Sequence, residues 1–159
     1  MNARSFLPTC GLVVALAVAV TTAVAATGSP AAARAAACTP GVRTVDGSPA
    51  RVFCGPAKAT VHVGGKTLAF SGGLCERSGG MYVLNMGTFF AGGSKSPRPY
   101  FGLLIAKPKP GTYKGQALSF RSGGVSKSSF ADVTLKTLHG GTFSGKLIGG
   151  GTVTGSFTC

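Results

Sequence analysis

From residue 59 to the C-terminus, short runs of β-branched and aromatic residues are separated by clusters of glycine. Within each run apolar and polar residues alternate, which places the two kinds of side chain on opposite faces of a strand. Residues 60–63 and 66–70 are two such runs, joined by Gly64 and Gly65. Because two glycines tolerate the positive φ angles of a type I′ turn, this segment is predicted to be a two-residue hairpin.

Two later runs, residues 81–86 and 100–106, are apolar at nearly every position rather than at alternate ones. Such runs are typical of central strands that are covered on each side or are buried in a barrel. The alternation resumes further along the chain, at Leu118, Phe120, Val133 and Leu135.

The last two runs, residues 141–147 and 151–157, share the pattern G-T-[F/V]-[S/T]-G-x-[L/F] and are predicted to be the arms of a terminal hairpin. Cys159 has the parity of the apolar residues in the second arm, so its side chain is expected to point inward. Gly145 and Gly155 share this inward parity, which indicates space for a large neighbouring side chain or a bend. No segment has the pattern of a useful helix. The expected fold is all-β, either an antiparallel β-sandwich or a small β-barrel, which have the same alternation.

The N-terminus has a different character. Arg4 precedes an uninterrupted apolar run, residues 11–20, which leads into a stretch of small residues. This is the organisation of a secretory signal peptide, so residues 1–26 are predicted to be a signal that is removed by cleavage near its end. An uncleaved membrane anchor is the alternative, because residues 6–26 would just cross about 30 Å of hydrocarbon.

Removal of the signal leaves roughly 130 residues, enough for one domain with a single core. Residues 27–37 are small and include Pro30, a composition typical of a tether, and residues 38–159 are predicted to be a single all-β domain. Its first part, residues 38–58, is rich in turn signals and is predicted to be a disulfide-pinned loop with one short extended piece. No later stretch has the length and apolarity of a transmembrane helix, so the mature domain is expected not to span a membrane.

Cysteine usage indicates disulfides. Cys10 lies in the predicted signal, which leaves Cys38, Cys54, Cys75 and Cys159 in an exported domain. Four cysteines allow three pairings. Cys38 with Cys54 and Cys75 with Cys159 is favoured, because the first bond closes a local loop and the second ties the last residue to the body of the domain. A metal site is the alternative, but the spacings are wide and neither histidine lies near a cysteine pair, so no metal or other cofactor is expected.

A glycine-flanked cysteine (residues 71–75, SGGLC), an apolar run leading to a glycine, a glycine-rich middle and a final threonine and cysteine follow one another in this order. In these features the sequence resembles the mycobacterial lipoprotein antigen family, over about residues 59–159. The resemblance implies a small β-rich envelope domain with a Cys75–Cys159 bridge and no established enzymatic activity. It also implies a lipid anchor on the cysteine after the signal, here Cys38, although the three alanines before it lack the leucine of a usual lipobox.

Charge suggests the class of partner. The chain has 16 Lys and Arg against 3 Asp and Glu, a formal net charge of +13. Such a charge attracts polyanions, although it also serves solubility alone. No acid lies between Glu76 and Asp132, and this interval holds lysines beside prolines, which keep a loop extended, and tyrosines, which stack on sugars or bases. The alternative is that these residues only protect a sheet edge. The candidate anion-binding residues are Lys95, Arg98, Lys107, Lys109, Tyr113 and Lys114.

Groups for acid–base catalysis are few. The histidines and carboxylates of the predicted domain are Asp46, His62, Glu76, Asp132 and His139. A Ser-His-Asp set would need Ser144, His139 and Asp132, but no G-x-S-x-G pattern is present. His62 is expected on the outer face of its hairpin. No catalytic site is therefore expected.

The sequence predicts an exported protein of the cell envelope or its surroundings that acts without catalysis, by binding an anionic surface or polymer through basic loops. Alternatives are an envelope structural or antigen-type lipoprotein whose charge is incidental, a small secreted hydrolase that uses His62 or His139, and a protease inhibitor that displays residues 107–114 as a basic loop. Specific nucleic-acid recognition is not expected, because no recognisable nucleic-acid-binding motif is present.

Overall fold

A computed structural model describes residues 38–91, 98–106 and 108–159, which all belong to one compact unit, Ala35–Cys159. The predicted signal peptide and tether, and the candidate residues Lys95 and Lys107, lie outside the described residues. No helix capable of spanning a bilayer occurs in the described ranges. Their strands are β1 (Gly41–Val45), β2 (Ser48–Phe53), β3 (Ala57–Val63), β4 (Lys66–Ser78), β5 (Met81–Phe90), β6 (Tyr100–Ala106), β7 (Gly111–Ser122), β8 (Val125–Thr137), β9 (Gly140–Leu147) and β10 (Thr152–Thr158).

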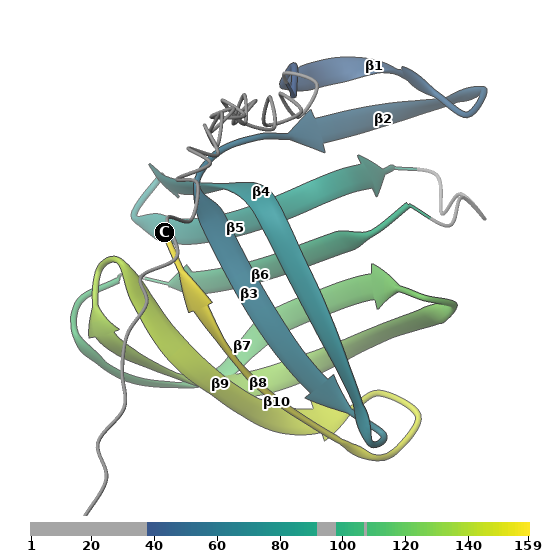
Figure 1. Cartoon of the computed structure of the whole chain (residues 1–159). Coiled ribbons are helices and arrows are strands. Elements are labelled where there is room, and N and C mark those ends of the chain that lie inside the picture. The colour runs from purple at the N-terminus through teal and green to yellow at the C-terminus, as the bar shows by residue number, and fades with distance from the viewer. Residues whose placement is uncertain (1–37, 92–97, 107) are drawn as a thin grey trace, which may run out of the picture. The chain divides into compact units, whose positions relative to one another are not determined.

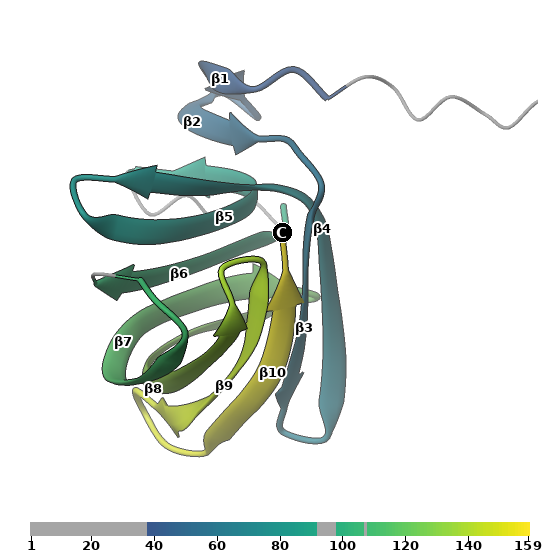
Figure 2. The same ribbon diagram turned by 90° about the vertical axis from the view of Figure 1, so that its left-hand side faces the viewer.

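Strands β3 to β10 form a closed, eight-stranded antiparallel barrel (Figures 1 and 2). Each strand pairs with the next in the chain, and β10 returns to pair with β3. Full closure leaves these strands without a free sheet edge. The all-β prediction is confirmed, and the barrel is the one of its two architectures that the structure shows.

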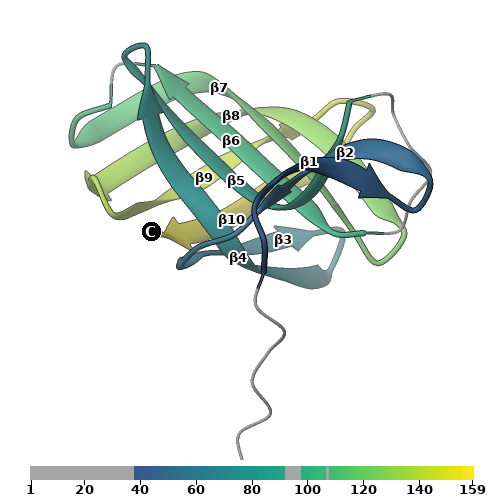
Figure 3. The ribbon, with the colours of Figure 1, turned by 90° about the horizontal axis from the view of Figure 1, so that it is seen from above.

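The β1–β2 hairpin continues the sheet outside the barrel (Figure 3). Strand β4 changes partner at Gly73, pairing with β3 before this residue and with β5 after it. A Cβ at Gly73 would lie 2.0 Å from Met86 Cγ and 2.5 Å from the Asn85 oxygen, so only glycine allows the two strands to approach there. Beyond this point β2 takes the place of β4 beside β5.

The prediction of a loop over residues 38–58 is wrong, because this segment forms two paired strands. Asp46 and Gly47 have φ angles of 50° and 76°, the positive values of a type I′ turn, and Val45 pairs with Ser48 across them. No residue of β1 is buried. A strand without a buried face needs no alternation of apolar and polar residues, so the pattern that predicts the other strands is missing from β1.

The interior of the barrel is filled by side chains. Phe70, Phe101 and Phe143 follow one another across it, with ring centroids 5.5 and 5.8 Å apart. The Phe143 ring lies over Gly155, where a Cβ would be 2.3 Å from Phe143 Cζ and 2.2 Å from the Thr60 oxygen. The predicted space for a large neighbour at Gly155 is thereby confirmed.

The two continuously apolar runs lie in β5 and β6, and each points one set of residues into the barrel. Leu84 and Leu103 are fully buried inside, whereas Leu104 faces outward and is 37% exposed. Both runs therefore belong to barrel strands, but only their inward side chains are buried, so the expected burial of both faces is wrong. Their second apolar face is turned away from the core.

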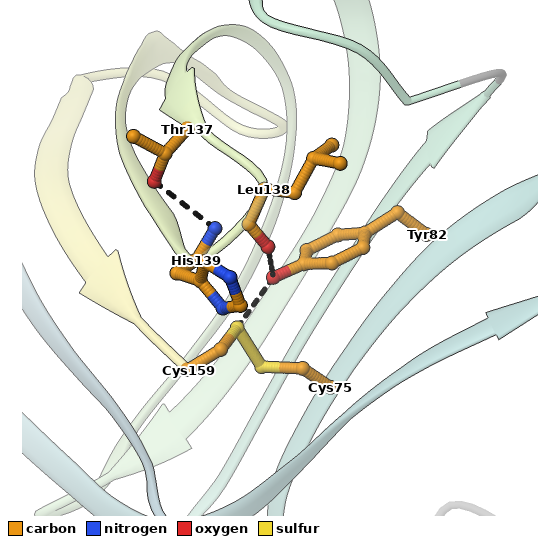
Figure 4. The surroundings of a disulfide bond; sticks show 6 residues. All are labelled: Cys75, Tyr82, Thr137, Leu138, His139 and Cys159. Atoms are coloured by element: carbon orange, nitrogen blue, oxygen red, sulfur yellow. Dashed lines mark hydrogen bonds between the residues drawn. A yellow bond between two sulfur atoms is a disulfide. The ribbon is translucent and has the colours of Figure 1, made fainter.

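The Cys75–Cys159 disulfide joins β4 to the residue after β10 and packs partly buried against the core (Figure 4). The Tyr82 hydroxyl contacts Cys159 Sγ and donates to the Leu138 oxygen at 3.3 Å, and the Cys159 N–H donates to the His139 oxygen at 2.8 Å. Burial raises the pKa of Tyr82, and nearby Arg77 opposes this shift. The hydroxyl therefore stays protonated and able to donate.

The second disulfide, Cys38–Cys54, joins the two ends of the β1–β2 hairpin. The structure thus has the pairing that the spacing of the four cysteines favours. Such bonds are characteristic of proteins in an oxidising compartment.

Candidate binding face of the barrel

The structure separates the predicted anion-binding residues. Arg98 precedes β6, whereas Lys109, Tyr113 and Lys114 follow it, so they lie at opposite ends of this strand. Seven residues of β6 span about 23 Å, at roughly 3.3 Å per residue. The described members of the set therefore do not form one site.

Two of these cations contact carboxylates that are distant in the sequence. Arg98 Nε and Nη2 donate to the two Asp46 oxygens at 2.7 and 2.9 Å, and this bidentate hydrogen bonding raises the pKa of the guanidinium. Lys114 Nζ lies 2.6 Å from Asp132 Oδ2. The Lys114 hydrogen bond, followed by that from the Gly115 N–H, lowers the pKa of the Asp132 carboxyl.

Tyr113 organises the loop between β6 and β7. Its hydroxyl accepts from the Lys109 N–H and donates to the Lys109 oxygen, both at 2.8 Å. This bonding fixes the loop from which the Lys109 side chain extends, exposed to solvent.

The three members of the Ser-His-Asp set do not come together. Asp132 and Ser144 are a cross-strand pair of β8 and β9, but the Asp132 carboxylate is bound by Lys114 and the Gly115 N–H. His139 lies in the turn between these strands, at the disulfide end (Figure 4). Among the described residues no group of three His, Cys, Asp or Glu side chains is placed to hold a metal ion.

A continuous polar surface covers the outside of β9, β10, β3 and the part of β4 that pairs with β3. Its side chains carry hydroxyl groups, lysine ammonium groups or the His62 imidazole, and they are exposed, apart from half-buried Thr60. We call this surface the hydroxyl-cation face; it comprises Lys58, Thr60, His62, Thr67, Ser71, Thr142, Ser144, Lys146, Thr152, Thr154, Ser156 and Thr158. We also include Lys66 at its rim, because Lys66 lines a hollow of the face at the tip of the β3–β4 hairpin, although it pairs with inward-facing Val63.

Strand register arranges these side chains in rows across the sheet. Ser144 pairs with Thr154, Thr154 with His62, and His62 with Thr67. His62 lies on the outer face, as predicted, with Nδ1 3.0 Å from Thr67 Oγ1. Neighbouring rows along a strand are about 6.8 Å apart and neighbouring strands about 4.8 Å apart, so the hydroxyls form a regular array.

Two shallow hollows lie within this face. One, of about 310 Å³, is lined by His62, Lys66, Thr67, Thr152 and Thr154. The other, of about 590 Å³, shares both threonines and adds Ser144, Lys146 and, from β8, Phe130 and Asp132. Residues 57–71 and 140–158, which supply the strands of the face, contain no Asp or Glu. These segments therefore supply hydrogen-bond donors and positive charge. The carboxylate that borders them, Asp132 of β8, is bound by Lys114 and the Gly115 N–H.

No single run of the sequence reveals this face. Its visible signal is the row of hydroxyl residues at successive outward positions of β10, from Thr152 to Thr158. The partners of that row come from residues 57–71 and 140–146, and only the pairing of β10 with both β3 and β9 brings them together.

Comparison with known proteins adds no relative. Neither the family models, nor the curated proteins, nor the solved structures contain a match to this chain. The class that the structure defines is an eight-stranded up-and-down antiparallel barrel with two disulfides.

Proposed function

We propose that the protein is an exported, non-catalytic binding domain of the cell envelope or its surroundings, and that it binds an anionic polymer or surface. Export is supported by the N-terminal signal pattern and by the two disulfides. The observation that carries the proposal is the hydroxyl-cation face, where three lysines and a row of hydroxyls lie together on residues 57–71 and 140–158, which contain no Asp or Glu.

The chemistry of this face matches a repeating anion. A lysine ammonium supplies three donors and a point charge, and Ser and Thr hydroxyls donate to phosphate or carboxylate oxygens. A polymer is the better ligand than a single ion, because Lys58 and Lys66 lie at opposite ends of the β3–β4 hairpin, while Lys146 lies on β9. Anionic groups spaced along one chain contact all three.

The proposal moves the main contact surface from the basic loops to the strands. Arg98 and Lys114 each contact a carboxylate, which offsets their attraction for an external anion. Lys95 and Lys107 lie outside the described residues, and their part in binding stays a prediction.

The disulfide also bears on attachment to the envelope. Cys38 Sγ is bonded to Cys54, so a lipid linked through the same sulfur would exclude this bond. The pairing therefore favours a freely secreted domain over a lipid-anchored one.

The test is binding of the oxidised protein to immobilised long-chain polyphosphate at low and high salt. Lys58→Gln, Lys66→Gln and Lys146→Gln together are expected to weaken binding at least tenfold. Added salt is expected to weaken the wild type strongly, since exposed charges are screened within about 8 to 10 Å at 0.1 to 0.15 M.

The matched control removes three exposed cations elsewhere, by Arg43→Gln, Lys109→Gln and Lys136→Gln. It has the same net charge as the first variant, and its affinity is expected to stay within threefold of wild type. Equal losses in the two variants would show that total charge, not this face, determines binding. Salt-independent retention would refute the electrostatic basis of the proposal.

A further inference from the structure

A second candidate site lies on the outer face of β5 to β8. It is a groove of about 350 Å³ with apolar walls that include Val83, Leu104, Phe130 and Ile148. Phe130 and Ile148 are 66% and 62% exposed, and the Ile148 N–H donates to the Ser128 oxygen at 2.9 Å, which holds the β9–β10 loop against β8. Large apolar side chains gathered on a surface are typical of a binding site.

The floor of the groove is polar and held in place. The Tyr100 hydroxyl donates to Asn85 Oδ1 at 2.8 Å, and the ring lies over Gly102, where a Cβ would be 2.3 Å from the hydroxyl oxygen. Burial raises the pKa of Tyr100, and a hydrogen bond with Ser119 opposes that shift. The phenol is therefore neutral at physiological pH and forms a preformed floor, as small-molecule sites usually have.

One end of the groove is cationic. A smaller hollow of about 140 Å³ shares Tyr100, Ser119 and Ser128 with the groove and adds Phe89, Arg121 and Lys127.

The Arg121 guanidinium at this end is held in place. Its Nε donates to the Arg98 oxygen at 3.1 Å, its Nη2 lies 3.4 Å from the Thr88 oxygen, and it sits 5.4 Å from the centroid of the Phe90 ring. The Lys127 side chain is exposed. The site thus runs from an apolar trough to a positively charged end.

We propose that this groove binds a single anionic amphiphile, with its alkyl chain along Val83, Leu104, Phe130 and Ile148 and its anionic head group at Arg121 and Lys127. The volume lies at the lower end of small-molecule sites, about 300 to 1,000 Å³, which fits one chain. A second copy of this protein is the poorer occupant, because a chain with a formal charge of +13 would face its own cations there. The groove shares the Phe130 side chain with the larger hollow at the hydroxyl-cation face, but its other walls and its cationic end lie elsewhere, so this proposal does not depend on that face.

The test is calorimetric titration of the full oxidised domain with decyl phosphate below its micelle concentration. Decyl phosphate is expected to bind at least tenfold more tightly than inorganic phosphate or decyl maltoside. Phe130→Ser with Ile148→Ser is expected to weaken binding at least tenfold. The control Val42→Ser, a residue 77% exposed on β1, is expected to leave it within twofold.

Lys127→Gln separates the head group from the chain. This substitution is expected to weaken the binding of decyl phosphate at least threefold and to leave the binding of decyl maltoside unchanged. Equal affinity for the two decyl ligands, no binding of decyl phosphate as a monomer, or an equal loss in the Val42→Ser control would overturn the proposal. So would sedimentation showing a wild-type dimer that Phe130→Ser with Ile148→Ser converts to monomer, since the groove would then be an interface between copies.

Discussion

Gly155 and Phe143 show how one missing side chain determines the packing of the barrel. The two residues pair across β9 and β10, and the absence of a Cβ at Gly155 leaves room for the Phe143 ring against the strand. On the other side, the backbone of β3 approaches so closely that a Cβ would touch the Thr60 oxygen. The inward-facing position of Gly155 is therefore the place where β3, β10 and the Phe143 ring are in close contact.

Gly155→Ala is predicted to destabilise the fold by about 2 kcal/mol, the usual scale for overpacking a core. The clash with the Thr60 oxygen involves backbone, which relaxes less readily than a side chain. The measurement is urea unfolding of the oxidised protein. Ser156→Ala is the control on the same strand; it faces outward and is expected to change stability by less than about 0.5 kcal/mol. A Gly155→Ala variant as stable as this control would contradict the packing account.

For single residues, the sequence predicts whether a side chain points inward or outward better than it predicts which residue that side chain contacts. Parity along β10 correctly gives the inward positions of Gly155 and Cys159, because the period of a strand is two residues. Contacts of the charged residues are not predictable in this way. Asp46 and Arg98 are 52 residues apart, so an interval without acids in the sequence does not mean a surface without acids in space.

Among the elements, β1 is the one whose order depends least on packing. It has no buried residue, pairs with β2 alone among the described strands, and is held at its base by the Cys38–Cys54 disulfide. In contrast β2 buries Ala50 and Val52 and pairs with β5.

Removing this disulfide by Cys38→Ser with Cys54→Ser is predicted to release β1 and to leave the barrel folded. Hydrogen exchange read by NMR is expected to show loss of protection at Gly41–Val45, while β8 and β9 keep theirs. In the chain-entropy model a loop of about 15 residues is worth about 3 kcal/mol, which here is local to the hairpin. The comparison is Cys75→Ser with Cys159→Ser, which unties β4 from β10 and is expected to lower protection throughout the barrel. Unchanged protection of β1 in the Cys38→Ser, Cys54→Ser variant would show that pairing with β2 is enough to keep β1 ordered without the disulfide.

The hairpins that the sequence predicts correctly carry their own turn signals. Gly64 and Gly65 join β3 to β4, and the terminal repeat gives β9 and β10. The β1–β2 hairpin has an Asp-Gly turn but no apolar alternation beside it, so the pattern of buried faces does not reveal it. The exchange of partners by β4 at Gly73 is equally invisible, because it depends on a contact with the backbone of β5.

In the whole molecule, closure of the barrel decides which outward residues become neighbours. Alternation alone fits a sandwich as well as a barrel, so the rows of the hydroxyl-cation face follow only from the pairing of β10 with β3. The same closure places the second apolar face of β5 and β6 on the outside, beside β7 and β8. The barrel thus has a polar, cationic side and a side with an apolar groove.

The most direct test of the account is an NMR titration of the 15N-labelled oxidised domain with short-chain polyphosphate. We expect the largest shift changes at the amides of the hydroxyl-cation face, on β3, β9, β10 and residues 66–71 of β4, and their disappearance in the Lys58→Gln, Lys66→Gln, Lys146→Gln variant. Shift changes confined to the segments around Arg98, Lys109 and Lys114, or no shifts at a ligand concentration that saturates binding by other methods, would contradict the assignment of the face.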